Sequence, residues 1–240
     1  MNEIHLVKHS LYNVSNTYGE RIFFIVPATQ DAVSRMWFEP FAEHTVNASW
    51  VAVQELEQLG LGEAVDLYVC EVPVEYQAVK LLLPSLWKGH QPQLVVHVGV
   101  SGLATTVTLE QCAHNKGYTR PDNCSFCPYS QCCVVNGPDC IKSILDMDTI
   151  CKRVNDAGIG ITVSTSEDAG RYLCDYTYYT SLHLGKGRAA FVHVPPLGRP
   201  YSGKDLGRGL QAVIQEMLKL LEGSHSEEAQ KGTKHSSDKP

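Results

Sequence analysis

Short apolar runs alternate with stretches of helical periodicity between residues 38 and 221 of this 240-residue chain. Two of the runs, 93–98 (QLVVHV) and 189–194 (AAFVHV), are almost continuously apolar, which is typical of central strands covered on both faces. Strands that alternate with helices in this way form a largely parallel sheet between helical layers. The sequence therefore predicts the α/β class, as a single-domain three-layer α/β/α sandwich with a mixed, largely parallel sheet.

The helical periodicities predict five helices with recognisable end signals. Asn47 can cap the first helix and Gly60 can end it, while Pro84 is expected to bend or break the second. Gly99 is expected to turn the chain after the strand before it. The predicted helices are 47–60, 74–87, 148–157, 174–184 and 203–221, and the further predicted strands are 65–69 and 159–164.

The chain is expected to form one domain with two extensions, because a domain usually has about 100–200 residues. Residues 36–222 form the predicted α/β domain, preceded by a divergent segment, 1–35. The apolar run 22–26 within that segment is a candidate for the first strand. Residues 223–240 mix Ser, Lys, Glu and Gly without apolar periodicity, which favours a solvated, disordered tail.

The charge composition argues against binding to nucleic acid or to a membrane surface. The chain has 20 Lys and Arg against 26 Asp and Glu, a formal net charge of −6 and no basic stripe. The first five residues carry no basic signal-peptide region, and the run 22–26 ends at Pro27, well short of a membrane span. The sequence therefore predicts a cytosolic protein with no nucleic-acid or membrane partner.

Nine cysteines cannot all pair within one chain, so their spacing has to distinguish metal ligands, a nucleophile and buried thiols. Four cysteines of one segment, with His114 before it and Cys140 after it, are dense enough to suggest a zinc site. The four are Cys124, Cys127, Cys132 and Cys133. However, adjacent residues of an extended chain point in different directions, so Cys132 and Cys133 make a poor ligand pair. Reduced thiols in a cytosolic loop are favoured, and no metal site is predicted.

Three residues at the predicted ends of elements have the chemistry of a thiol hydrolase. Cys174 lies at a predicted helix start, where N–H groups and the helix dipole stabilise a thiolate, although a small buried residue is the alternative. His193 lies near the end of an apolar strand, the edge at which open α/β sheets bind ligands. A satisfied core histidine is its alternative and is the expected role of His97. Glu110 requires a partner such as an imidazolium if it is buried, and otherwise ends a strand in solvent.

Four blocks of sequence between residues 38 and 221 carry a resemblance to a known family. The blocks are FEPFAEHTVNASW, VVHVGVSG with TTVTLE, DAGRYLCDYTYYTSL and FVHVPPLG. In these blocks the chain resembles the pyroglutamyl-peptidase I family, peptidase family C15. The resemblance implies a cysteine peptidase that hydrolyses the N-terminal pyroglutamyl residue of peptides and uses no cofactor. It places the acid, the nucleophile and the histidine of the family at Glu110, Cys174 and His193.

The N-terminal part of this resemblance departs from the family pattern. The family begins with an apolar strand that runs into Gly-Phe-Gly-Pro-Phe-Gly, whereas this chain has Trp, Glu and Ala at positions 37, 39 and 42. The resemblance implies that Phe38 and Phe41 hold the flat lactam ring, with Asn47 as a nearby polar residue. The departure makes the chain look most like the mammalian 1-like branch. Because glycine at such a turn often allows positive φ or close ligand approach, a catalytically impaired paralogue with a binding or regulatory role is the alternative.

Overall fold

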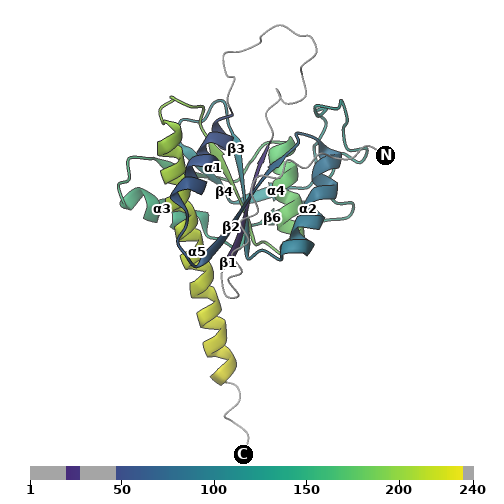
Figure 1. The fold of residues 1–240 in the computed structure, drawn as a ribbon. Coiled ribbons are helices and arrows are strands. Elements are labelled where there is room, and N and C mark those ends of the chain that lie inside the picture. The colour runs from purple at the N-terminus through teal and green to yellow at the C-terminus, as the bar shows by residue number, and fades with distance from the viewer. Residues whose placement is uncertain (1–19, 28–46, 235–240) are drawn as a thin grey trace, which may run out of the picture.

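An open, six-stranded sheet runs through the centre of the molecule, with helices against both of its faces (Figure 1). The computed structural model describes residues 20–27 and 47–234, and the side chains of 47–223. The strand order is β2-β1-β3-β8-β4-β7, and β5 and β6 form a separate pair. The elements in chain order are β1 (Glu20–Pro27), α1 (Ala48–Leu59), β2 (Val65–Val72), α2 (Tyr76–His90), β3 (Leu94–Val100), β4 (Val107–Glu110), β5 (Cys112–His114), β6 (Cys140–Lys142), α3 (Met147–Asp156), β7 (Val163–Ser166), α4 (Leu173–Leu184), β8 (Ala189–Val194) and α5 (Gly203–Lys234).

The sheet is mixed but mostly parallel. β2, β1, β3 and β8 all run in the same direction. β4 pairs antiparallel with β8 and parallel with β7, so the direction changes once across the sheet. The arrangement confirms the predicted α/β/α class with a largely parallel sheet.

β1 lies inside the sheet, between β2 and β3. It pairs with β2 along its whole length, and Ile22 to Ile25 also pair with β3. The apolar run 22–26, a candidate strand in the sequence, is therefore part of a central strand. The segment between β1 and α1, residues 28–46, lies outside the described residues.

Two apolar cores flank the sheet, one under each helical layer. α1, α3 and α5 cover one face, and α2 and α4 cover the other (Figure 1). Successive residues of a strand point to opposite faces, so Val96 and Val98 enter the first core whereas Val95 enters the second. This double coverage explains why the central strands are continuously apolar rather than alternating.

α2 is not broken at Pro84, and one predicted strand begins later than expected. α2 continues through Pro84, which removes one N–H donor and leaves the carbonyl of Lys80 without its helical partner. Both residues are exposed, so water can satisfy that carbonyl. The strand expected at 159–164 begins only at Val163, because Gly158 and Gly160 have φ values of +62° and +83°, outside the extended region.

α5 extends to Lys234, past the end expected at Leu221, so part of the predicted tail is helical. The apolar face of α5 ends at Leu221, and the residues beyond it include the good helix formers Glu, Ala, Gln and Lys. The apolar periodicity therefore ends before the helix does. Among residues 47–234, no helix combines the length and the apolar character that crossing a membrane requires.

The packing of α5 on α1 predicts that Gly207→Ala destabilises the protein. A Cβ atom at Gly207 would lie 2.5 Å from Cβ of Glu55 and 3.2 Å from the backbone N of Leu56. We expect the free energy of unfolding in urea to fall by about 1–3 kcal/mol, the usual cost of overpacking. Gly223→Ala is the matched control on the same helix, because its Cβ would meet nothing within 4 Å.

The control should be neutral or stabilising by up to about 1 kcal/mol, since alanine has the higher helix propensity. If the free energy of unfolding of Gly207→Ala equals or exceeds that of the unmodified protein, α1 and α5 do not pack as closely as described.

Candidate active site

Cys174 is the second residue of α4, near the N-terminal end of that helix. The cap residue, Tyr172, is extended, with φ −141° and ψ −159°, and its side chain makes no capping hydrogen bond. The N–H groups of the first turn are therefore not satisfied by a side-chain cap. Together with the positive end of the helix dipole, they favour negative charge at this end of α4.

His193 and Glu110 meet where the sheet changes direction. His193 of β8 lies opposite Thr108 of β4, so Glu110, two residues further along β4, projects from the same face as Thr108. The His193 Nδ1 and Glu110 Oε1 atoms are 2.8 Å apart. Both residues are buried, with 8% and 2% of their surfaces exposed, so the pair is shielded from water. This contact answers the question of how a buried Glu110 is compensated.

The environment of His193 favours its charged form. Burial lowers its pKa, but hydrogen bonds with Cys174 and Glu110 outweigh that effect and raise the pKa to about 9. The imidazole thus interacts with both the Cys174 thiol and the Glu110 carboxylate. A thiol, an imidazole and a carboxyl group are the set of groups that a thiol hydrolase uses.

Gly99 allows Cys174 and the sheet to approach closely. Gly99 pairs with His193 across β3 and β8, so it lies within the strand and not in the turn that the sequence suggested. A Cβ atom here would lie 2.8 Å from the ring of Phe191 and 3.3 Å from Sγ of Cys174. Only glycine fits this position without displacing the thiol or the aromatic ring.

Two aromatic residues that the sequence reasoning missed hold the site together. The Tyr178 hydroxyl donates to the backbone carbonyl of Glu110 over 2.8 Å and so connects α4 to β4. The Phe191 ring lies 4.7 Å from the His193 ring and 5.9 Å from the Tyr178 ring, between centroids. Their spacing could have identified them, because residues one helical turn apart, or two positions apart in a strand, share a face. Tyr178 is one helical turn after Cys174, and Phe191 is two strand positions before His193.

A small, largely apolar pocket adjoins the Cys174 thiol. Its lining consists of Val72, Pro73, Val74, His97, Leu173, Cys174, Thr177 and Phe191. His97 is 1% exposed, and its Nε2 lies 2.7 Å from Oγ of Ser181. Burial lowers the pKa of His97 to about 3, so the pocket holds a neutral imidazole. His97 is a hydrogen-bonded core histidine, as predicted, and the pocket offers an uncharged environment.

Asp175, next to Cys174 in the chain, is a buried carboxyl group that the sequence reasoning did not single out. It accepts hydrogen bonds from the His114 backbone N–H over 3.1 Å and from the Tyr118 hydroxyl over 3.0 Å. Arg171 Nη1 lies 3.4 Å away. Burial raises the pKa of Asp175 to about 7 although these partners act in the opposite direction. Asp175 thus ties the start of α4 to β5.

The residues predicted to bind the substrate ring fall into two groups. Phe38 and Phe41, together with positions 37, 39 and 42, lie outside the described residues. Asn47 is described and caps α1, because its Oδ1 accepts from the Ser49 backbone N–H over 3.0 Å and from the Ser49 hydroxyl over 2.7 Å. Asn47 therefore has a structural role, and its role toward a substrate stays a prediction.

The cysteines of segment 124–133 do not gather into the zinc site that the sequence analysis considered as an alternative. All nine cysteines are free thiols. Within the part of the chain that the structure describes, the only group of three or more possible ligand side chains is Cys112, His114 and Cys140. Cys112 was not among the candidates, and the four cysteines of segment 124–133 are not in the group.

The close contact at Gly99 predicts that Gly99→Ala makes the Cys174 thiol less reactive. The added methyl group has to displace Phe191 or Cys174, which weakens the contact between the thiol and His193. We expect the alkylation rate of Cys174 by iodoacetamide at pH 6.5, followed by peptide mass spectrometry, to fall by about tenfold or more.

Gly102→Ala is the matched control in the following turn, because its Cβ would meet nothing within 4 Å. Unchanged alkylation of Cys174 in the Gly99→Ala variant would contradict the described geometry.

Comparisons with known proteins identify the family of the chain. Residues 33–217 match the family model described as pyroglutamyl peptidase. The chain is 68% identical to pyroglutamyl-peptidase 1 of Homo sapiens over 187 residues, which cover 78% of this chain and 90% of that protein. It is 49% identical to the human pyroglutamyl-peptidase 1-like protein over 166 residues, 68% of this chain and 84% of that protein. The chain is thus more similar to pyroglutamyl-peptidase 1 than to the 1-like protein. The expectation of the 1-like branch rested only on the N-terminal departures from the family pattern.

The fold also matches solved structures. The crystal structure of pyrrolidone carboxyl peptidase from Fervidobacterium islandicum AW-1 superimposes with a TM-score of 0.70 at 21% identity, covering 83% of this chain and 99% of that one. At that identity the match supports the fold alone. The family model and the identity to the human protein together show that the chain belongs to the pyroglutamyl peptidase family.

Proposed function

We propose that this protein is a cysteine-type omega exopeptidase that removes an N-terminal pyroglutamyl residue from peptides. Cys174 acts as the nucleophile, His193 as general acid and base, and Glu110 as the residue that orients His193. The observation that carries the proposal is the position of His193, which is hydrogen-bonded to Glu110 over 2.8 Å and whose pKa is raised by both Glu110 and Cys174. Family membership supports the substrate class, because the human relative with 68% identity is named pyroglutamyl-peptidase 1.

The first half of the reaction transfers the acyl group to the enzyme. The Cys174 thiolate attacks the carbonyl carbon of the pyroglutamyl residue, and a C–S bond forms while the carbonyl oxygen takes up negative charge. Backbone N–H groups at the start of α4 stabilise this oxyanion. The His193 imidazolium then donates its proton to the departing peptide nitrogen, and the C–N bond breaks.

The second half releases the product and restores the enzyme. Neutral His193 accepts a proton from water as the water oxygen attacks the thioester carbon. The C–S bond breaks, pyroglutamic acid leaves, and the Cys174 thiolate again faces the His193 imidazolium. Throughout the cycle the Glu110 carboxylate accepts from Nδ1, which keeps Nε2 directed toward the reacting atoms.

The pocket chemistry suits a neutral ring better than a charged side chain. The side chains around Cys174 are mainly apolar, and His97 is uncharged. Phe38 and Phe41 are proposed to complete the binding of the lactam ring, as the family resemblance implies. The mechanism assigns no role to a cofactor. A nucleophilic thiol and eight further free thiols suit a reducing compartment such as the cytosol.

Hydrolysis of a fluorogenic pyroglutamyl amide by the purified full chain tests the proposal. We expect Cys174→Ser and His193→Ala to lower kcat by at least about a thousandfold, because each removes one member of a cooperating set. Cys151→Ser is the matched control, since the Cys151 thiol lies on α3 and donates to the Val163 carbonyl, a bond that serine can keep.

If the unmodified protein cleaves the amide no faster than Cys174→Ser, the peptidase proposal is wrong. The catalytically impaired paralogue then replaces it. In that event, recovery of cleavage after Trp37→Gly, Glu39→Gly and Ala42→Gly would place the defect in the ring-binding loop.

The raised pKa of His193 predicts the alkaline side of the pH profile. The proton that His193 donates to the leaving amine is lost as the pH rises through about 9, so kcat/KM should fall over that range. Glu110→Gln removes the carboxylate that raises this pKa, so the fall should begin about one to three pH units lower. Stopped assays between pH 6 and 10 measure both profiles. Identical alkaline limbs would mean that Glu110 does not control the protonation of His193.

A further inference from the structure

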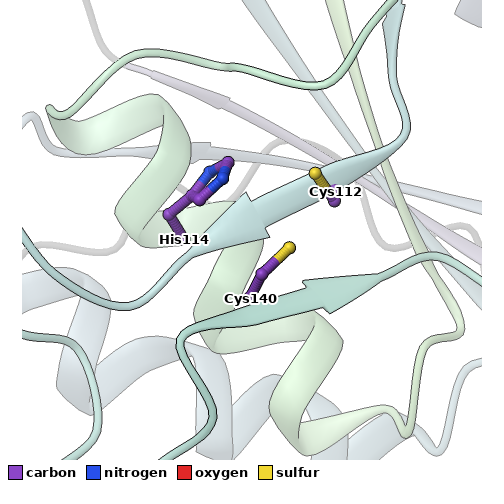
Figure 2. A group of neighbouring side chains, drawn as sticks. All are labelled: Cys112, His114 and Cys140. Atoms are coloured by element: carbon purple, nitrogen blue, oxygen red, sulfur yellow. The ribbon is translucent and has the colours of Figure 1, made fainter.

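Three side chains that can bind a metal lie together on the paired strands β5 and β6, and none of them is a proposed catalytic residue. Cys112 and His114 are two residues apart on β5, so they project from the same face of the strand. His114 lies opposite Cys140 of β6. Figure 2 shows the three side chains beside one another, with Cys112 and His114 on one strand and Cys140 on the neighbouring strand.

We propose that Cys112, His114 and Cys140 bind a Zn²⁺ ion. One ligand atom from each side chain lies within 4.8 Å of the other two. In a tetrahedral zinc site with bonds of about 2.0–2.3 Å, neighbouring ligand atoms are about 3.5–3.8 Å apart. The cluster is therefore slightly wider than an occupied site, and small side-chain movements are enough to close it. Two thiolates and one imidazole also match the softness of zinc.

The surroundings of the cluster leave its ligand atoms accessible to an ion. His114 Nδ1 is buried and has no hydrogen-bond partner among the described residues, and the nearest carboxylate, Asp175 Oδ1, is 4.0 Å away. Cys140 is exposed, so an ion can enter from solvent and water can occupy the fourth coordination position. The Cys112 thiol donates to the backbone carbonyl of Glu167 over 3.2 Å and also interacts with Cys140, its proposed fellow ligand. None of these contacts prevents coordination.

The site lies between two segments that carry the proposed catalytic residues. Cys112 follows Glu110 by two positions, and the His114 backbone N–H donates to Asp175, the residue after Cys174. A bound ion would join β5 to β6. It would thereby restrict the motion of the segment that follows Glu110 and of the start of α4, which Asp175 ties to β5. Because the ligands come together only in the folded chain, zinc is expected to stabilise the native state.

Zinc binding is tested in the Cys174→Ser background, since the Cys174 and His193 pair could itself bind zinc. The full chain, kept reduced with a phosphine, is dialysed against micromolar Zn²⁺, and the metal retained per chain and the Tm are measured. We expect one equivalent of zinc and a raised Tm. Co²⁺ in place of Zn²⁺ should give the intense near-ultraviolet absorption of thiolate-to-cobalt charge transfer.

Cys140→Ser is the informative variant, because Cys140 is exposed and its loss leaves no buried cavity. It should weaken zinc binding by more than about tenfold and abolish the gain in Tm, while circular dichroism confirms the fold. Cys132→Ser is the matched control: a half-buried cysteine near the hairpin, outside the cluster. Less than half an equivalent of zinc in the background protein, or equal retention by Cys140→Ser, would overturn the proposal.

Discussion

The antiparallel contact between β4 and β8 is the feature on which the proposed active site depends. In a wholly parallel sheet, residues that follow strands meet at one edge, but here a buried acid has to meet a histidine inside the sheet. The reversal places Thr108 opposite His193 and brings Glu110 within 2.8 Å of the imidazole. Because both partners stand on strands with hydrogen-bonded neighbours on each side, little conformational freedom remains for either side chain.

Cys174, the proposed nucleophile, is positioned by contacts that hold α4 against this pair of strands. The Tyr178 hydroxyl binds the Glu110 carbonyl, and Asp175 binds the backbone of β5. Gly99 removes the one side chain that would keep the helix start and the sheet apart. The segment formed by β4 and β5, which carries Glu110, therefore also determines the position of Cys174 relative to His193. A cluster of thiols and a histidine lies two residues further along that backbone, which is why metal binding there would act on the same support.

The strength of local signals determined which parts of the molecule could be predicted. Apolar runs covered on both faces identified the central strands, and a turn with Gly170 at φ +88° preceded the predicted start of α4. Gly99 was misassigned because a glycine in a strand resembles a turn glycine unless its close neighbours are known. That α2 is not broken at Pro84 could not be predicted, because the exposure that lets water replace the lost helical bond is not visible in the sequence.

The sequence by itself determined the α/β layering, the family, and the three residues proposed for catalysis, since these follow from periodicity, local motifs and resemblance. Only the tertiary structure decided that β1 enters the sheet between β2 and β3, and that Glu110 binds His193 over 83 residues of chain. It likewise decided which cysteines meet, because Cys112 and Cys140 belong to different strands and come together through pairing. Pairing and register depend on the balance of contacts across the whole sheet, whereas composition and spacing report on one segment at a time.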